Sequence, residues 1–106
     1  KSFVKGIAHI TGGGFLGNIP RILPKNVDCI IRIGSWRVPW IFNFIKSEGK
    51  VDELEMYRVF NMGIGMIIVV SQQHIDKILQ SIPKAVVIGE IVRGTGKILL
   101  DKNFRC

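Results

Sequence analysis

The 106-residue sequence contains few of the residues that build metal sites and nucleophilic active sites. It has only two cysteines, two histidines and eight acidic residues. Cys29 and Cys106 are far apart, and Cys29 lies in an apolar run, as buried cysteines do. G-x-S-x-G, H-E-x-x-H and carboxylate-cluster patterns are all absent. We therefore expect no metal site in this chain, and a reducing compartment, the cytoplasm, as its location.

Long hydrophobic runs are absent as well. The longest apolar stretch, counting its glycines, covers residues 62–70, and a membrane-spanning helix needs about 20 residues. No signal peptide follows Lys1, so we expect no membrane association. The apolar content of 47% nevertheless suffices for a core, which predicts one globular domain over residues 1–106. A first residue other than Met, within a strand-like pattern, indicates a fragment of a longer protein.

Acidic residues are fewer than basic residues, and the formal net charge is +7. The 15 basic residues are scattered along the chain, and no aromatic residues alternate with them as they do in a nucleic-acid stacking surface. A positive surface attracts anions in general. The sequence therefore favours a phosphorylated small molecule over nucleic acid as the anionic partner, with a merely solvated basic surface as the alternative.

Hydrophobic periodicity predicts strands and helices mixed within one unit. The element order is β-loop-α-β-α-α-β-α-β-β, which predicts an α/β (α+β) fold with helices packed on a mixed sheet. Asn18 is predicted to cap the first helix, and residues 94–96 to form a tight hairpin between the last two strands. The predicted strands cover residues 3–10, 27–33, 64–70, 85–92 and 97–100; the helices cover 18–23, 39–47, a segment starting at 52, and 72–82 after a cap at Ser71.

Three consecutive glycines follow the first predicted strand, in the segment AHITGGGF at residues 8–15. Glycine permits positive φ angles and lets a ligand approach backbone N–H groups closely, which suits a phosphate or carboxylate. The alternative is a tight turn that needs glycine for steric reasons, and the residues alone leave both open. His9 directly precedes the loop; a lone histidine is more often structural, but the end of a strand opens to clefts in α/β folds.

A second glycine-rich segment, FNMGIGM at residues 60–66, leads into the third predicted strand. Gly63 and Gly65 are two residues apart and so lie on the same side of an extended chain. Close packing of a neighbouring element against that side is the favoured interpretation. Asn61 could orient a ligand or cap the preceding turn.

Four motifs give the chain a family resemblance. They are the segment AHITGGGF with NIPRILP at 18–24, SWRVPWIF at 35–42, EMYRVFNMGIGM at 55–66 and VIGEIV at 87–92. In this order, over nearly the whole chain, they resemble the C-terminal domain of the aminoimidazole ribonucleotide synthetases (phosphoribosylformylglycinamidine cyclo-ligases). The segment 99–106 departs from any pattern of that family that we can place.

The resemblance implies a two-domain subunit that forms a homodimer and acts in purine biosynthesis. Such an enzyme uses ATP to activate the formyl oxygen of formylglycinamidine ribonucleotide by phosphorylation, and ring closure then yields aminoimidazole ribonucleotide. ATP and Mg²⁺ would be bound mainly by the N-terminal domain, which this chain lacks. The alternatives are a stand-alone phosphate-binding or regulatory module of the same fold, and the equivalent domain of a sister ATP-dependent enzyme.

The same resemblance assigns residues to a site. His9 would have a polar or proton-handling role as the catalytic candidate. The substrate- or phosphate-binding candidates are Thr11, Gly12, Gly13 and Gly14, flanked by Asn18 and Arg21, with Asn61, Gly63 and Gly65 as a second wall. No metal ligand is expected among them.

Overall fold

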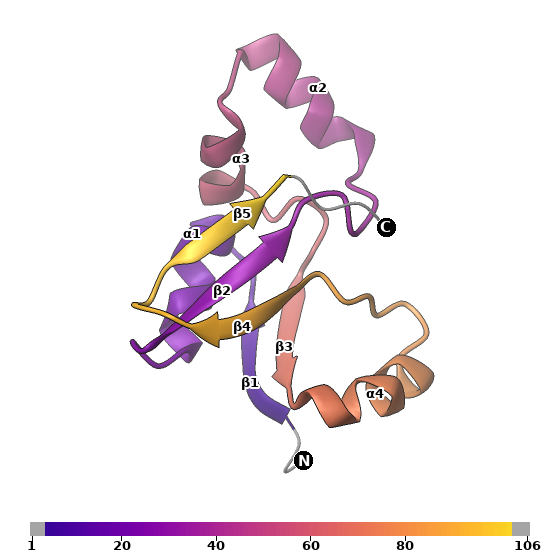
Figure 1. Ribbon diagram of the computed structural model, residues 1–106. Helices are drawn as coiled ribbons and strands as arrows, with labels where there is room; N and C mark the ends of the chain where they lie inside the picture. The colour runs from indigo at the N-terminus through magenta and orange to yellow at the C-terminus, as the bar shows by residue number, and fades with distance from the viewer. Residues whose placement is uncertain (1–3, 103–106) are drawn as a thin grey trace.

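The computed structural model describes residues 4–102. Its helices and strands are mixed along the chain and pack on one another, so the predicted α+β class is confirmed (Figure 1). In chain order the elements are β1 (Val4–His9), α1 (Gly14–Asn18), the 3-10 helix η1 (Ile19–Ile22), β2 (Val27–Arg32), α2 (Trp40–Gly49), α3 (Glu53–Val59), β3 (Met66–Val70), the 3-10 helix η2 (Gln72–His74), α4 (Ile75–Ser81), β4 (Gly89–Arg93) and β5 (Ile98–Asp101).

The strands form two sheets rather than the single mixed sheet that we expected. Strands β1 and β3 make an antiparallel pair, and β4, β2 and β5 make a three-stranded sheet in that order. In the second sheet β2 runs antiparallel to β4 and parallel to β5. The sheet with β2 at its centre is therefore mixed, whereas β1–β3 is purely antiparallel.

The predicted hairpin between the last two strands is wrong, because β4 and β5 lie on opposite sides of β2 (Figure 1). The connection crosses one end of β2 instead, and a β2 carboxylate holds it there. Asp28 Oδ1 accepts hydrogen bonds from the backbone N–H groups of Thr95, Gly96 and Lys97, at 2.9, 3.1 and 2.8 Å. A Cβ on Gly94 would collide with the same carboxylate, so glycine is required for this crossing.

These hydrogen bonds make the stability of the crossing depend on pH. The N–H of Lys97, followed by that of Thr95, holds the pKa of the Asp28 carboxyl below its ordinary value of 3.8. A pKa that is depressed in the folded state contributes stability above the unfolded value, and that contribution is lost as pH falls through the folded pKa. We expect Asp28→Asn to lower the thermal midpoint at pH 7, with a difference from wild type that narrows below about pH 3.8.

A control separates this effect from a general change of charge. Glu48→Gln removes one negative charge from the exposed side of α2, where Glu48 has no hydrogen bond or ion pair within residues 4–102. Thermal scans of both variants and wild type between pH 2.5 and 7 provide the measurement. A midpoint difference for Asp28→Asn that stays constant over this range would show that the charge of the carboxylate has no part in holding the crossing.

Several element boundaries also differ from the predictions. The helix predicted over 18–23 is the 3-10 helix η1, and Asn18 stands at its N-cap position but makes no side-chain capping hydrogen bond; the helix α1, which was not predicted, precedes it from Gly14. Of the strand predicted over 85–92, only the part from Gly89 onward is extended in the sheet, as β4. A Cβ on Gly89 would meet the carbonyl oxygen of Ile30, which explains why glycine starts this strand beside β2.

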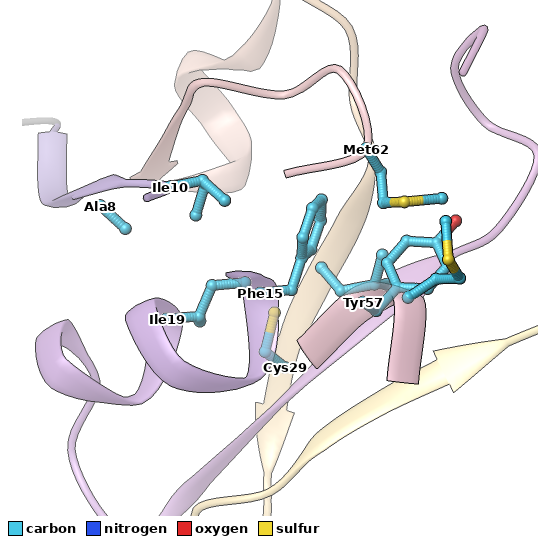
Figure 2. Packing of buried hydrophobic residues seen from close by; sticks show 9 residues of the cluster. Ala8, Ile10, Phe15, Ile19, Cys29, Tyr57 and Met62 are labelled. Atoms are coloured by element: carbon cyan, nitrogen blue, oxygen red, sulfur yellow. The ribbon is translucent and has the colours of Figure 1, made fainter. Parts of the chain in front are cut away.

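The core joins α1, α3 and the two sheets. Phe15 and Tyr57 are fully buried, and their rings meet edge to face with centroids 5.4 Å apart (Figure 2). Trp36 stacks on Phe15 at 5.7 Å, so three aromatic rings from three segments form one cluster. Cys29 of β2 is buried in this core, and burial raises the pKa of its thiol to about 11. Cys29 is therefore a core side chain and not a reactive nucleophile.

Candidate functional site

The two glycine-rich segments, far apart in sequence, lie side by side where β1 ends and β3 begins. His9 pairs with Met66 across the two strands. The pairing continues beyond the last ladder residue, because the N–H of Ile10 donates to the carbonyl of Gly65 at 2.9 Å. The loop after β1 and the turn before β3 are thus the two adjoining parts of one candidate site.

The glycine loop, residues 11–14, is a turn with two left-handed residues. Gly13 has φ 98° and Gly14 has φ 57°, and the N–H of Gly14 donates to the carbonyl of Thr11 at 3.0 Å. Residues other than glycine rarely adopt these φ angles. The turn therefore explains two of the three glycines through backbone conformation alone.

The loop glycines differ in what surrounds them. Gly14 is buried against the end of α3: a Cβ there would collide with the carbonyl oxygen of Tyr57 and lie 2.8 Å from that of Phe60. A Cβ on Gly12 would meet nothing within 4 Å, and Gly12 is exposed. The steric interpretation of the loop thus accounts for Gly14, whereas nothing in the fold demands glycine at position 12.

Asn18 lies beneath the loop and not on its surface. It is 5% exposed, and its Nδ2 donates to the carbonyls of Gly14, Thr11 and Gly12 at 2.8, 3.3 and 3.4 Å. Its Oδ1 accepts a hydrogen bond from the Thr11 hydroxyl at 3.3 Å. The polar atoms of Asn18 are therefore engaged by the loop itself.

The second wall is a turn stabilised by its own side chain. Asn61 Oδ1 accepts the N–H of Gly63 at 2.8 Å, so Asn61 stabilises the turn that follows it and not the preceding turn that we expected it to cap. Gly63 has φ 93°, and a Cβ there would collide with the ring of Pro39. Gly65 is exposed, and a Cβ on it would meet nothing within 4 Å. Of the three residues, Gly65 leaves the most room beside its backbone.

Two residues outside the predicted site hold this turn in place. The indole Nε1 of Trp36 donates to the carbonyl of Met62 at 3.1 Å, and Pro39 packs against Gly63. Met62 has the positive φ of 54°, which a non-glycine residue adopts only at some cost. The W-x-V-P spacing of residues 36–39 marked this segment in the sequence, but only the fold shows that it supports the second wall.

His9 lies directly before the loop, whereas the structure does not bring Arg21 to it: Arg21 belongs to η1, whose last residue, Ile22, packs against Gly6 in β1. Both side chains are exposed, His9 at the end of β1 and Arg21 in η1. Within residues 4–102, no carboxylate pairs with either. The geometry thus leaves both side chains available to a ligand, and a catalytic role for His9 stays a prediction.

The part of the chain described here offers no metal centre. Among residues 4–102, no three His, Cys, Asp or Glu side chains come close enough to hold an ion. In the same range, no helix has the length and apolar character to cross a membrane.

Comparison with known proteins identifies the family. Residues 1–102 match the family described as "AIR synthase related protein, C-terminal domain". Curated relatives named phosphoribosylformylglycinamidine cyclo-ligase include one from Caldicellulosiruptor bescii, 54% identical over 101 residues, and one from Thermoanaerobacter sp. (strain X514), 52% identical over 101 residues. Each alignment covers 92% of this chain and 30% of the relative.

The relatives include a plant protein as well as bacterial ones. The cyclo-ligase of Vigna unguiculata, named chloroplastic/mitochondrial, is 50% identical over 99 residues, covering 91% of this chain and 26% of the relative. The chain therefore spans about a third of the length of the curated relatives that it matches. Because the family match extends over nearly all of the 106 residues, the chain belongs to the AIR synthase related family, as a representative of its C-terminal domain.

Proposed function

We propose that this chain is the substrate-cleft part of a phosphoribosylformylglycinamidine cyclo-ligase. The enzyme would close formylglycinamidine ribonucleotide to aminoimidazole ribonucleotide in an ATP-dependent step of purine biosynthesis. Family membership supports the proposal, and so do the names of relatives at about 50% identity from bacteria and a plant. Because the chain spans only about a third of those relatives, the activity is proposed for the longer enzyme and not for this segment alone.

The observation that carries the site assignment is the pairing of the two glycine segments through Ile10 and Gly65. It places Gly65 beside Ile10, two residues before Gly12, and a Cβ on either glycine would meet nothing within 4 Å. Within the described residues, the N–H groups of Gly12 and Gly13 donate to no other group. We propose that these N–H groups bind an anionic part of the substrate, with Thr11 beside them, and that the positive charge of the exposed Arg21 in η1 attracts the same group.

The proton-handling residue of the proposal is His9. It ends β1 directly before the loop, and its exposed ring can approach a ligand held by the loop. Imidazole can accept or donate a proton near neutral pH, which ring closure at an amidine nitrogen requires. His9 would thus transfer a proton, and the loop would neutralise the negative charge of the same substrate.

The residues described here do not form a binding site for the Mg²⁺ that accompanies ATP. Mg²⁺ prefers carboxylate oxygens, and residues 4–102 contain no cluster of acidic side chains. We propose that both are bound mainly by the N-terminal domain of the enzyme. This chain would then contribute one side of the substrate cleft and no metal ligand.

Exposed apolar side chains support a partner domain. Trp40 is 72% exposed and Met66 61%, although large apolar side chains are usually buried. Met66 lies beside His9 at the proposed site, so a domain packed there would also close the cleft. We propose that the N-terminal domain covers part of this surface, in a homodimeric cytoplasmic enzyme. Among residues 4–102, the other exposed large apolar side chains are those of Ile7, Ile41, Phe44, Leu54, Val59, Ile82, Val86, Val87 and Leu99.

The proposed function predicts that activity needs the longer protein. The full-length enzyme should convert formylglycinamidine ribonucleotide and ATP to aminoimidazole ribonucleotide, whereas residues 1–106 alone should show no turnover above background. The reason is the missing set of Mg²⁺ ligands. An assay of ADP and product release on both proteins measures this, and circular dichroism establishes whether the isolated segment is folded.

The same assay separates the alternatives. A stand-alone binding or regulatory module would bind phosphate compounds without turnover in any length of the protein. Turnover of a different substrate, with none of formylglycinamidine ribonucleotide, would identify a sister ATP-dependent enzyme. Turnover by residues 1–106 alone would contradict the division of the site between two domains.

A further inference from the structure

The orientation of the buried Asn18 carboxamide is fixed by chemistry. Its Nδ2 faces the carbonyl oxygens of Gly14, Thr11 and Gly12. Carbonyl oxygens only accept hydrogen bonds, so the group that faces them must be the NH₂ and not the oxygen. The oxygen in turn faces the Thr11 hydroxyl, which can donate. A single side chain therefore binds three of the four residues of the loop.

These bonds determine where the loop N–H groups point. All described peptide bonds are trans, and in a trans peptide the C=O and the N–H point in opposite directions. The Thr11 carbonyl is turned toward Asn18, so the N–H of Gly12 is turned away from it. The Gly12 carbonyl is also turned toward Asn18, and the N–H of Gly13 is turned away in the same manner. Two successive N–H groups thus leave the loop on the side opposite the buried amide.

The position of Asn18 in α1 makes this arrangement possible. Asn18 follows Gly14 by four residues, about one helical turn, and helical side chains lean toward the N-terminus. Its side chain therefore reaches back beneath the loop. A Cβ on Gly13 would make only ordinary contacts, 3.6 Å from the Gly17 Cα and 4.0 Å from the Asn18 amide nitrogen, so it is the φ of 98° that favours glycine there.

We propose that Asn18 is a positioning residue that turns the N–H groups of Gly12 and Gly13 toward the substrate. It holds the carbonyls of the loop inward and does not itself touch the ligand. The inference rests on the proposed function and deepens it, because it replaces the expected direct contact of Asn18 with an indirect role. A loop without these bonds keeps its glycines but loses the fixed direction of its two donors.

The test uses the full-length enzyme. Asn18→Ala removes the carboxamide, and Asn18→Asp keeps its shape and the acceptor for Thr11 but replaces the NH₂ by an oxygen facing three carbonyls. We expect both variants to lose on the order of a hundred-fold in kcat/KM. Most of this loss should come from a higher KM for formylglycinamidine ribonucleotide, because the N–H groups of Gly12 and Gly13 that bind it are displaced. Assays run at least 10 °C below the thermal midpoint of each variant.

A neighbouring core residue provides the matched control. Ile19→Ala removes a side chain that is 1% exposed and follows Asn18 directly, but that makes no hydrogen bond to the loop through its side chain. It should lower the thermal midpoint while leaving KM within about two-fold of wild type. A KM for Asn18→Ala and Asn18→Asp that is equally unchanged would overturn the inference, because Asn18 would then support stability alone.

A second pair of variants, at Thr11, tests the network even if the Asn18 variants misfold. Thr11→Val removes the hydroxyl that donates to Asn18, while Thr11→Ser keeps it. We expect Thr11→Val to raise KM several-fold and Thr11→Ser to stay near wild type; equal KM values in both would count against the network even if the Asn18 variants do not fold. Wild-type enzyme without turnover of formylglycinamidine ribonucleotide would instead refute the proposed function itself.

Discussion

Replacing Gly14 by alanine is expected to unfold the C-terminal domain or to destabilise it by about 3 kcal/mol or more. A non-glycine residue at a left-handed φ costs about 1–3 kcal/mol, and overpacking adds a similar amount. The new Cβ would collide with the carbonyl oxygen of Tyr57 and lie 2.8 Å from that of Phe60. Both neighbours belong to the backbone at the end of α3, which moves only if the helix moves.

Gly12→Ala is the matched control. It changes the same residue type in the same loop, but its Cβ would meet nothing within 4 Å and Gly12 has no positive φ. Its thermal midpoint should stay within a few degrees of wild type. Soluble yield and thermal unfolding of the two full-length variants give the comparison. Similar midpoints for both would mean that α1 can shift away from α3 at little cost.

The second large effect is expected on binding. Gly12→Val in the full-length enzyme should leave folding nearly intact but weaken substrate binding by a hundred-fold or more. The branched side chain would occupy the open space beside the N–H groups of Gly12 and Gly13. Losing two hydrogen bonds to a charged group costs about 3–6 kcal/mol, at about 1.5–3 kcal/mol each, which corresponds to at least a hundred-fold in affinity.

Gly12 serves this test better than Gly13. A side chain at Gly13 would be strained at φ 98° whatever the ligand does, so Gly13→Val would mix a folding effect with a binding effect. The measurements are the dissociation constants for formylglycinamidine ribonucleotide and for ATP, together with the thermal midpoint. If Gly12→Val binds both as tightly as wild type, the loop is purely architectural and its assignment as a site is wrong.

Local patterns predicted most of the elements, because each depends on residues close in sequence. The apolar run before Ser71 became β3, and the helical spacing from Ile75 became α4. Strand partners were not predictable in this way. The short turn at 94–96 looked like a hairpin from its glycines, yet β4 and β5 each pair with β2 and not with each other. Only the hydrogen bonds that the N–H groups of Thr95, Gly96 and Lys97 donate to Asp28 show how this turn is held in the fold.

The location of the candidate site was predictable, but the roles within it were not. Consecutive glycines and the N-M-G-x-G turn marked both segments, and their adjacency follows from the pairing of β1 with β3. The difference between Gly12 and Gly14 depends on α3, some forty residues away, which no local pattern encodes. Asn18 was expected to cap a helix because its type favours caps, whereas α1 starts four residues earlier and places it below the loop.

The central position of β2 has a consequence for synthesis on the ribosome. Its neighbours β4 and β5 are translated long after it, and the bond from Lys97 to Asp28 spans 69 residues. Cys29 and Ile31, buried side chains of β2, therefore have no sheet partner while the intervening chain is being made. Contacts this distant form slowly. This part of the protein should thus complete its core only after residue 101 has left the exit tunnel, and until then it depends on protection from aggregation.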